Sequence, residues 1–217
     1  MKPKVKICCI SSLQEAMDAI RCGAAAVGLV GEMPSGPGVI SDEMIKTIAQ
    51  LVPPPIATFL LTSEVTGAKI IAHHSKVHTN TIQIVDYPEP GAYAQIRAAL
   101  PAIKIVQVVH VEGEASVEFA NRISPAVDAI LLDSGSPAAA TKTLGGTGKT
   151  HDWALSRRIR ESTQKPIFLA GGLHAGNVRE AIELVQPYGL DLCSGVRTNG
   201  ALDPFKLEQF FEAIEKI

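Results

Sequence analysis

The stretch Val5-Lys6-Ile7-Cys8-Cys9-Ile10 sets a pattern that the rest of the chain repeats. It is a short apolar run without regular polar alternation, as expected for a parallel strand that is covered on both faces. Such runs alternate with helix-type segments, and we expect strands at 5–10, 25–30, 56–61, 81–85, 103–111, 129–133, 166–170 and 190–193. Eight strand–helix units without a break in composition predict an α/β fold, a (β/α)8 TIM barrel that spans residues 1–217 as one domain.

A doubly wound open sheet is the alternative architecture. That fold usually carries a glycine-rich nucleotide fingerprint in its first turn, but the turn here, Cys8-Cys9-Ile10-Ser11-Ser12, contains no glycine. In the preferred barrel, all strands end at one mouth. The thiol that ends the first strand would then face the carboxylate of Asp133, which ends the sixth.

Composition excludes several classes of partner. The net charge is −2 and no strongly basic or acidic block is present, which argues against nucleic acid or an anionic membrane as the main partner. The start of the chain, residues 1–4, leads directly into the first strand without a signal-peptide core or a long apolar run, so we expect a cytoplasmic protein. The cysteines lack the spacing of a zinc site and are interpreted as reduced thiols: Cys8, Cys9, Cys22 and Cys193. Nothing in the sequence indicates the oligomeric state.

Glycines follow the last two expected strands, in Gly171-Gly172 and in Ser194-Gly195. In TIM barrels these two loops commonly bind phosphate through backbone N–H groups and the N-terminus of a short helix. Ordinary tight turns would also use glycine, but two such turns at the seventh and eighth units favour a phosphate site.

The segment Gly145-Gly146-Thr147-Gly148-Lys149-Thr150 is similar to the end of a nucleotide-binding P-loop. The leading glycine of that motif would fall at Thr143, and no apolar strand leads directly into the segment. We therefore expect a glycine-rich loop that closes over a ligand instead.

Cys8 and Asp133 are the acid–base candidates because both end strands at the predicted mouth. The two-residue period of a strand places Lys6 and Cys8 on the inner face and Cys9 on the outer face. Taken singly, a cysteine is more often a small buried apolar residue and an aspartate a cap or turn former. His110 ends the fifth strand, where a histidine bonded to backbone or water is the preferred interpretation, and no His, Asp and Glu set has metal spacing.

Five motifs occur in a fixed order along the chain: Val5-Lys6-Ile7-Cys8, Leu131-Leu132-Asp133, Gly145-Gly146-Thr147-Gly148 with Asp152-Trp153, Leu169-Ala170-Gly171-Gly172-Leu173 with Asn177-Val178, and Ser194-Gly195-Val196. In this set the chain resembles the phosphoribosylanthranilate isomerase family of tryptophan biosynthesis over nearly its full length. The resemblance implies an isomerase barrel without cofactor or metal that acts on a small phosphorylated sugar by an Amadori rearrangement. It implies that Cys8 is the general base, that Asp133 is the general acid, and that the two glycine turns hold the phosphate.

Four positions depart from the family pattern. Cys9 replaces the usual glycine, Gly38 stands where an arginine meets the anthranilate end, Val85 replaces a histidine, and Arg197 replaces a glutamate. One alternative is therefore a divergent paralogue that isomerises or binds another phosphorylated sugar, with Arg197 or His110 contacting its far end. A non-catalytic barrel that binds a phosphorylated metabolite is a further alternative, which the retention of both acid–base candidates disfavours.

Overall fold

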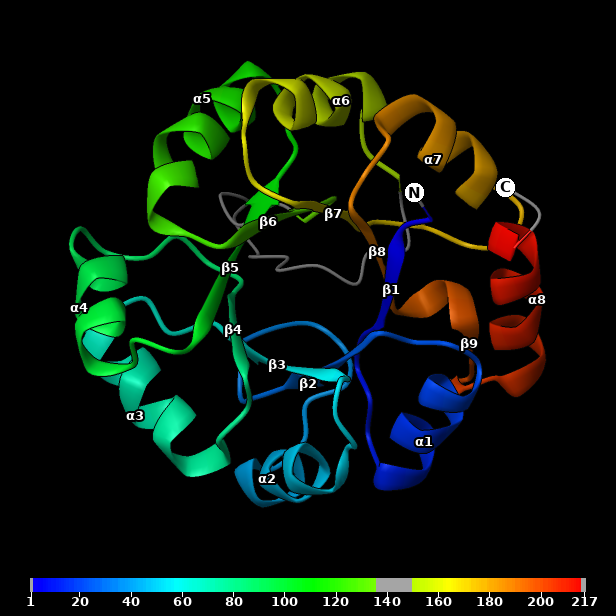
Figure 1. Cartoon of the computed structure of the whole chain (residues 1–217), viewed down its shortest axis with the longest axis horizontal. Coiled ribbons are helices and arrows are strands. Elements are labelled where there is room, and N and C mark those ends of the chain that lie inside the picture. The colour runs from blue at the N-terminus through cyan, green and yellow to red at the C-terminus, as the bar shows by residue number, and fades with distance from the viewer. Residues whose placement is uncertain (1, 136–149, 216–217) are drawn as a thin grey trace.

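Eight parallel strands close into a barrel in the computed structural model of the chain, which describes residues 2–135 and 150–215 (Figure 1). Each strand pairs with its neighbours in sequence, and the first strand also pairs with the last, which closes the ring. The strands are β1 (Lys4–Ile7), β2 (Ala26–Val30), β3 (Ala57–Thr62), β4 (Thr81–Ile84), β5 (Lys104–His110), β6 (Ala129–Asp133), β7 (Ile167–Leu169) and β8 (Gly189–Leu192). The predicted (β/α)8 architecture is confirmed.

A helix follows each strand, and the helices form an outer ring around the barrel (Figure 1). They are α1 (Leu13–Arg21), α2 (Asp42–Leu51), α3 (Gly67–Val77), α4 (Ala92–Ala99), α5 (Glu114–Ile123), α6 (Trp153–Ser162), α7 (Val178–Val185) and α8 (Pro204–Glu215). Short polar side chains define several helix starts. Ser12 Oγ accepts a hydrogen bond from the Glu15 N–H at 3.2 Å, and Ser41 caps α2 in the same way.

Between β8 and α8 the chain forms a short 3-10 helix and a small antiparallel hairpin. The 3-10 helix spans Ser194–Val196, and the hairpin pairs β9 (Arg197–Thr198) with β10 (Ala201–Leu202). This hairpin lies beside α1 (Figure 1), so the end of the chain returns to the first strand–helix unit.

Side chains alternate between two apolar layers. In β6, Ala129 and Leu131 pack inside the barrel, whereas Ile130 and Leu132 pack outward against the helices. The same alternation carries Asp133 to the inner face at the carboxyl end of the strand. The barrel interior is therefore filled below the mouth, and polar groups collect where the strands end.

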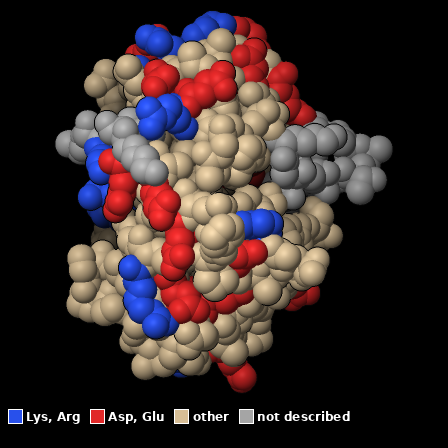
Figure 2. All heavy atoms as spheres, turned by 90° about the vertical axis from the view of Figure 1, so that its right-hand side faces the viewer, with Lys and Arg blue, Asp and Glu red and all other residues tan. Residues whose placement is uncertain are grey.

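One face of the molecule carries charges of both signs. Figure 2 shows acidic and basic side chains interspersed over the face that lies to the right in Figure 1. Within the described part of the chain, no helix is both long enough and apolar enough to cross a membrane.

Candidate active site

A cavity opens at the carboxyl ends of the strands, and five of the eight predicted site residues that the structure describes line it. Its wall includes Cys8, Asp133, Gly171, Gly172 and Ser194. These residues come from the ends of β1, β6, β7 and β8, so the closure of the barrel brings together groups that are far apart in sequence. The predicted thiol, carboxylate and glycine turns thus share one cavity.

Asp133 ends β6 directly opposite His110, its register partner on β5. The backbone N–H of Ser134 donates a hydrogen bond of 2.7 Å to its Oδ1 atom. Burial raises the pKa of Asp133, and Asp191 adds to this effect. The Ser134 N–H, His110 and Lys6 act in the opposite direction, but the pKa remains above its ordinary value. The carboxyl group is therefore biased toward its protonated form.

A buried ion pair lies beneath the thiol. Lys6 Nζ is 2.8 Å from Asp191 Oδ1, and the Lys6 side chain has no exposed surface. Burial alone would lower the pKa of Lys6, but Asp191 and the nearby thiols raise it above its ordinary value. A Cβ on Gly28 would lie 3.0 Å from Lys6 Nζ and 2.9 Å from Cys8 Sγ. Gly28 therefore leaves room for an ammonium group and a thiol in the same small space.

Cys9 lies inside the mouth, and the prediction that it points outward is wrong. Regular strand structure ends at Ile7 rather than at residue 10, and Cys9 adopts a left-handed backbone with φ 61°. Period-two alternation does not apply to such a residue. Its side chain lines the same cavity as Cys8, and its Sγ lies 2.8 Å from Cys193 Sγ.

Cys9 and Gly38, two of the four positions that depart from the family pattern, are in direct contact. Gly38 has φ +80°, and a Cβ added to it would lie 2.5 Å from Cys9 Cβ and 2.9 Å from Cys9 Cα. These distances leave no space for a side chain at position 38 while Cys9 is present. The backbone dihedral independently favours glycine there. The cysteine at position 9 and the glycine at position 38 therefore fit each other.

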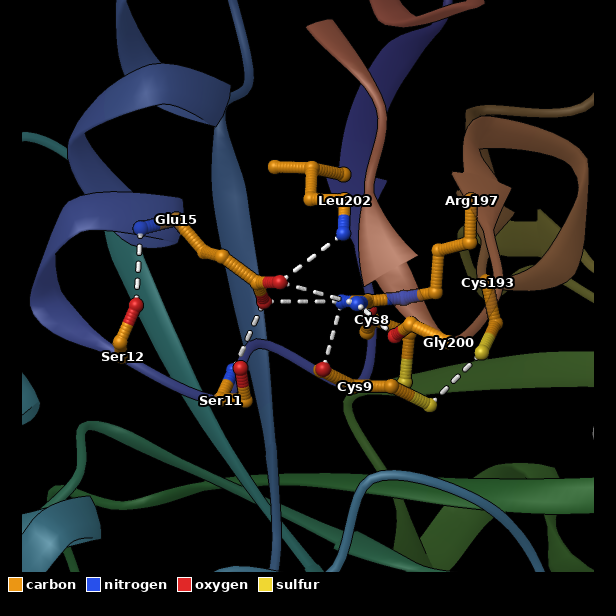
Figure 3. A network of polar contacts seen from close by, with 9 residues as sticks. All are labelled: Cys8, Cys9, Ser11, Ser12, Glu15, Cys193, Arg197, Gly200 and Leu202. Atoms are coloured by element: carbon orange, nitrogen blue, oxygen red, sulfur yellow. Dashed lines mark hydrogen bonds and ion pairs between the residues drawn. The ribbon is translucent and has the colours of Figure 1, made fainter.

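The Arg197 guanidinium forms hydrogen bonds to other residues of the same chain and holds the segment that carries Cys8 and Cys9 (Figure 3). Its Nη2 donates to the carbonyl oxygens of Cys9 at 2.5 Å and Cys8 at 3.3 Å, and its Nη1 donates to Gly200 at 2.9 Å. Both nitrogens also contact the Glu15 carboxylate at 3.1 Å. Burial would raise the pKa of Glu15, but Arg197 and two backbone N–H groups hold it below its ordinary value.

His110 is buried and bonded to backbone, as preferred from the sequence. Its Nε2 lies 3.0 Å from the Val85 carbonyl oxygen. Val85 itself lines the cavity at the position where the family pattern has histidine. His110 and Arg197 thus both hold parts of the mouth in place, through Val85 and through the segment after β1.

The two glycine turns have backbone conformations that few other residues adopt. Gly171 and Gly172 have φ values of 81° and 62°. Gly195 lies against the neighbouring turn, where a Cβ would overlap the Leu173 carbonyl oxygen. Asn177 fixes the first turn by donating from Nδ2 to the Gly172 carbonyl at 3.0 Å. The turns after β7 and β8 therefore pack on each other at one side of the cavity.

The predicted substrate loop, Gly145, Gly146 and Thr147, lies outside the described residues. Sequence reasoning did not assign a place in the mouth to Asp191 or Cys193, which also line the cavity. Their positions in β8 and just after it carry a signal, because inward residues of the last strand meet those of the first in a closed barrel.

A closed (β/α)8 barrel with these groups around one cavity defines a TIM-barrel enzyme with its candidate site at the carboxyl ends of the strands. A family model described as N-(5'phosphoribosyl)anthranilate (PRA) isomerase matches residues 5–213. The chain therefore belongs to the N-(5'-phosphoribosyl)anthranilate isomerase family.

Individual relatives cover nearly the whole chain. The N-(5'-phosphoribosyl)anthranilate isomerase of Methanosarcina acetivorans is 37% identical, covering 99% of this chain and 94% of the relative. The crystal structure of phosphoribosyl anthranilate isomerase from Thermotoga maritima is 31% identical, with a TM-score of 0.82 and coverage of 99% and 100%. Another solved phosphoribosyl anthranilate isomerase, in complex with reduced 1-(o-carboxyphenylamino)-1-deoxyribulose 5-phosphate, is 29% identical, with a TM-score of 0.80 and the same coverage.

Proposed function

We propose that the chain converts N-(5'-phosphoribosyl)anthranilate into 1-(o-carboxyphenylamino)-1-deoxyribulose 5-phosphate, a step of tryptophan biosynthesis that we expect to occur in the cytoplasm. The observation that carries the proposal is the shared cavity of Cys8, Asp133 and the turns after β7 and β8. Family membership supports it, as does the relative solved with the reduced form of this product.

In the proposed reaction Asp133 is the general acid. Its proton passes to the ring oxygen of the ribose while the bond from C1 to that oxygen breaks, which leaves a protonated imine between C1 and the anthranilate nitrogen. An acid of this kind must hold its proton in the bound state, and the raised pKa of Asp133 supports that role.

Cys8 is the general base. The positive charge of the protonated imine acidifies the hydrogen on C2, and the Cys8 thiolate removes it as a proton to give a neutral enolamine. The hydroxyl proton of the enolamine is then replaced by a proton on C1, which yields the ketone, and exchange with solvent restores Asp133 and Cys8. The buried ammonium of Lys6 supplies the nearby positive charge that a thiolate requires.

The turns at Gly171, Gly172, Ser194 and Gly195 bind the substrate phosphate in this proposal. Backbone N–H groups at glycine turns can approach phosphate oxygens closely. Fixing the phosphate holds the ribose between the thiol and the carboxyl group, and such positioning lowers the barrier of both proton transfers. Asp191 keeps Lys6 in place beneath the site.

Turnover of phosphoribosylanthranilate by the purified chain tests the proposal, with substrate and product separated by chromatography. We expect Cys8→Ala and Asp133→Asn each to reduce kcat by about 10²–10⁴-fold, because each removes one proton-transfer group. The matched control is Cys22→Ala, which alters a thiol at the end of α1, outside the cavity, and should keep full activity. Absence of turnover by the wild-type chain above these two variants would exclude the proposed reaction.

A further inference from the structure

Three thiols meet at one side of the mouth, although the proposed reaction uses only one. Cys8, Cys9 and Cys193 all line the cavity. The Sγ atoms of Cys9 and Cys193 lie 2.8 Å apart, although 184 positions separate the residues in sequence (Figure 3). Within residues 2–135 and 150–215 no cluster of His, Cys, Asp or Glu side chains could hold a metal ion.

The position of Cys9 in this pair is fixed by its own backbone and by contacts with Arg197 and Gly38. The left-handed backbone of Cys9 turns its side chain toward β8, and Arg197 binds the Cys9 carbonyl oxygen at 2.5 Å. Gly38 leaves the space that the Cys9 side chain occupies. A disulfide bond is about 2.05 Å long, so the sulfur atoms need to move by less than about 1 Å to reach bonding distance.

The two thiols differ in acidity in the way that a reactive pair requires. The hydrogen bond between the two thiols, assisted by the positive charges of Arg197 and Lys6, lowers the pKa of Cys193 against the opposing effects of burial and Asp191. Hydrogen bonding to Cys193 and Cys8, together with burial, raises the pKa of Cys9. Cys193 is thus the thiol that ionises more readily, and Cys9 is the less acidic thiol beside it. Cys193 is also the more accessible of the two, being partly exposed.

We propose that Cys9 and Cys193 are an oxidisable dithiol that closes to a disulfide in the presence of a peroxide. The Cys193 thiolate attacks one peroxide oxygen, the O–O bond breaks, and Cys193 becomes a sulfenic acid while hydroxide leaves. The Cys9 sulfur then attacks the Cys193 sulfur, the S–O bond breaks, and the Cys9 proton leaves with the oxygen as water. Overall, two thiols and one hydrogen peroxide give one disulfide and two water molecules.

The disulfide would join the segment after β1 to the turn after β8. Cys8 precedes one half of the bond and Ser194 follows the other, so the bond would fix the spacing between two sides of the cavity. Disulfides in reducing compartments are usually transient or redox-sensing. The assignment goes beyond the proposed isomerisation and does not depend on it, because its readout is the covalent state of the polypeptide.

The test is oxidation of the reduced, full-length chain with hydrogen peroxide, followed by intact mass and peptide mapping with fragmentation. We expect a loss of two hydrogen masses, a single cross-link between Cys9 and Cys193, and full reversal by dithiothreitol. The cross-link should persist in Cys8→Ala and Cys22→Ala and should be absent from Cys9→Ala. If a variant does not fold, the peptide map of the oxidised wild-type chain still identifies which cysteines are cross-linked. Retention of all four thiols, or a cross-link that uses Cys8, would overturn the assignment, as would a sulfinic acid at Cys193 without any cross-link.

Discussion

Cys9 and Gly38 show how one residue determines what another position can hold. The backbone of Cys9 is left-handed, a conformation in which glycine carries no steric penalty. Its side chain fills the space next to Gly38, where the family pattern has an arginine. The sequence shows both departures, but it does not show that they touch. Their contact depends on how the loop after β2 packs against the segment after β1.

Gly38→Ala should destabilise the chain. A residue with a Cβ at φ +80° costs about 1–2 kcal/mol, and the overlap with Cys9 adds to that cost. Cys9→Gly should relieve the overlap with the Cys9 side chain, but neither the 2.9 Å approach to the Cα atom at position 9 nor the dihedral penalty. The two changes should therefore be non-additive, with a coupling of about 0.5–3 kcal/mol. Urea denaturation of the wild type, both single variants and the double variant measures the coupling. Strictly additive free energies of unfolding would show that the two residues do not compete for space.

The ionisation of the buried Asp133 carboxyl group should lower the free energy of unfolding at neutral pH. Its pKa is raised in the folded chain, so the folded state retains a proton that the unfolded state has already lost above pH 3.8. Stability should therefore fall as the pH rises through this window, and replacing the carboxyl group with a neutral amide removes that dependence.

We expect Asp133→Asn to have a higher melting temperature than the wild type at pH 7, with the difference shrinking toward pH 3. Thermal unfolding followed by circular dichroism across this pH range is the measurement. A variant that is less stable than the wild type at pH 7 would contradict the assignment of a carboxyl group kept at a raised pKa.

At the scale of elements, the contact between β1 and β8 closes the barrel and carries the buried ion pair. Lys6 and Asp191 are register partners in this contact, and their charged groups lie 2.8 Å apart. The inward direction of Lys6 follows from strand alternation and was predicted. Its partner was not, because pairing between the first and last strands depends on the register at which the barrel closes.

Lys6→Met should destabilise the chain by about 3–5 kcal/mol, because it leaves the Asp191 carboxylate buried without its counter-charge. Replacing both partners, as Lys6→Met with Asp191→Leu, should cost much less, since no uncompensated charge remains. Urea denaturation of the two variants separates these cases. Equal destabilisation of both would mean that packing at this position, rather than charge, determines the cost.

Arg197 shows a second limit of sequence reasoning at this scale. It replaces a family glutamate and suggested a contact with the far end of a substrate, but the hairpin of β9 and β10 carries its guanidinium to Glu15 and to the segment after β1. Arg197 and Glu15 are 182 residues apart in sequence. No local pattern indicates such a contact.

At the level of the whole molecule, the order and spacing of the strand–helix units in the sequence are sufficient to predict the barrel. Apolar strands alternate with helices from β1 to α8, and the inner and outer layers follow from the two-residue period. That order also predicted that Cys8 and Asp133 share one mouth, and both residues line the cavity there. Cys9 escaped prediction because its left-handed backbone ends the strand period two residues after Ile7.

In the proposed reaction, Cys8 removes the C2 hydrogen of the bound ribose once Asp133 has opened the ring. Its most direct test is single-turnover conversion of phosphoribosylanthranilate carrying either hydrogen or deuterium at C2, by the wild type and by Cys8→Ala. We expect slower conversion of the deuterated substrate by the wild type, and a rate for Cys8→Ala that is about 10²–10⁴-fold lower. Conversion by Cys8→Ala at the wild-type rate would contradict it.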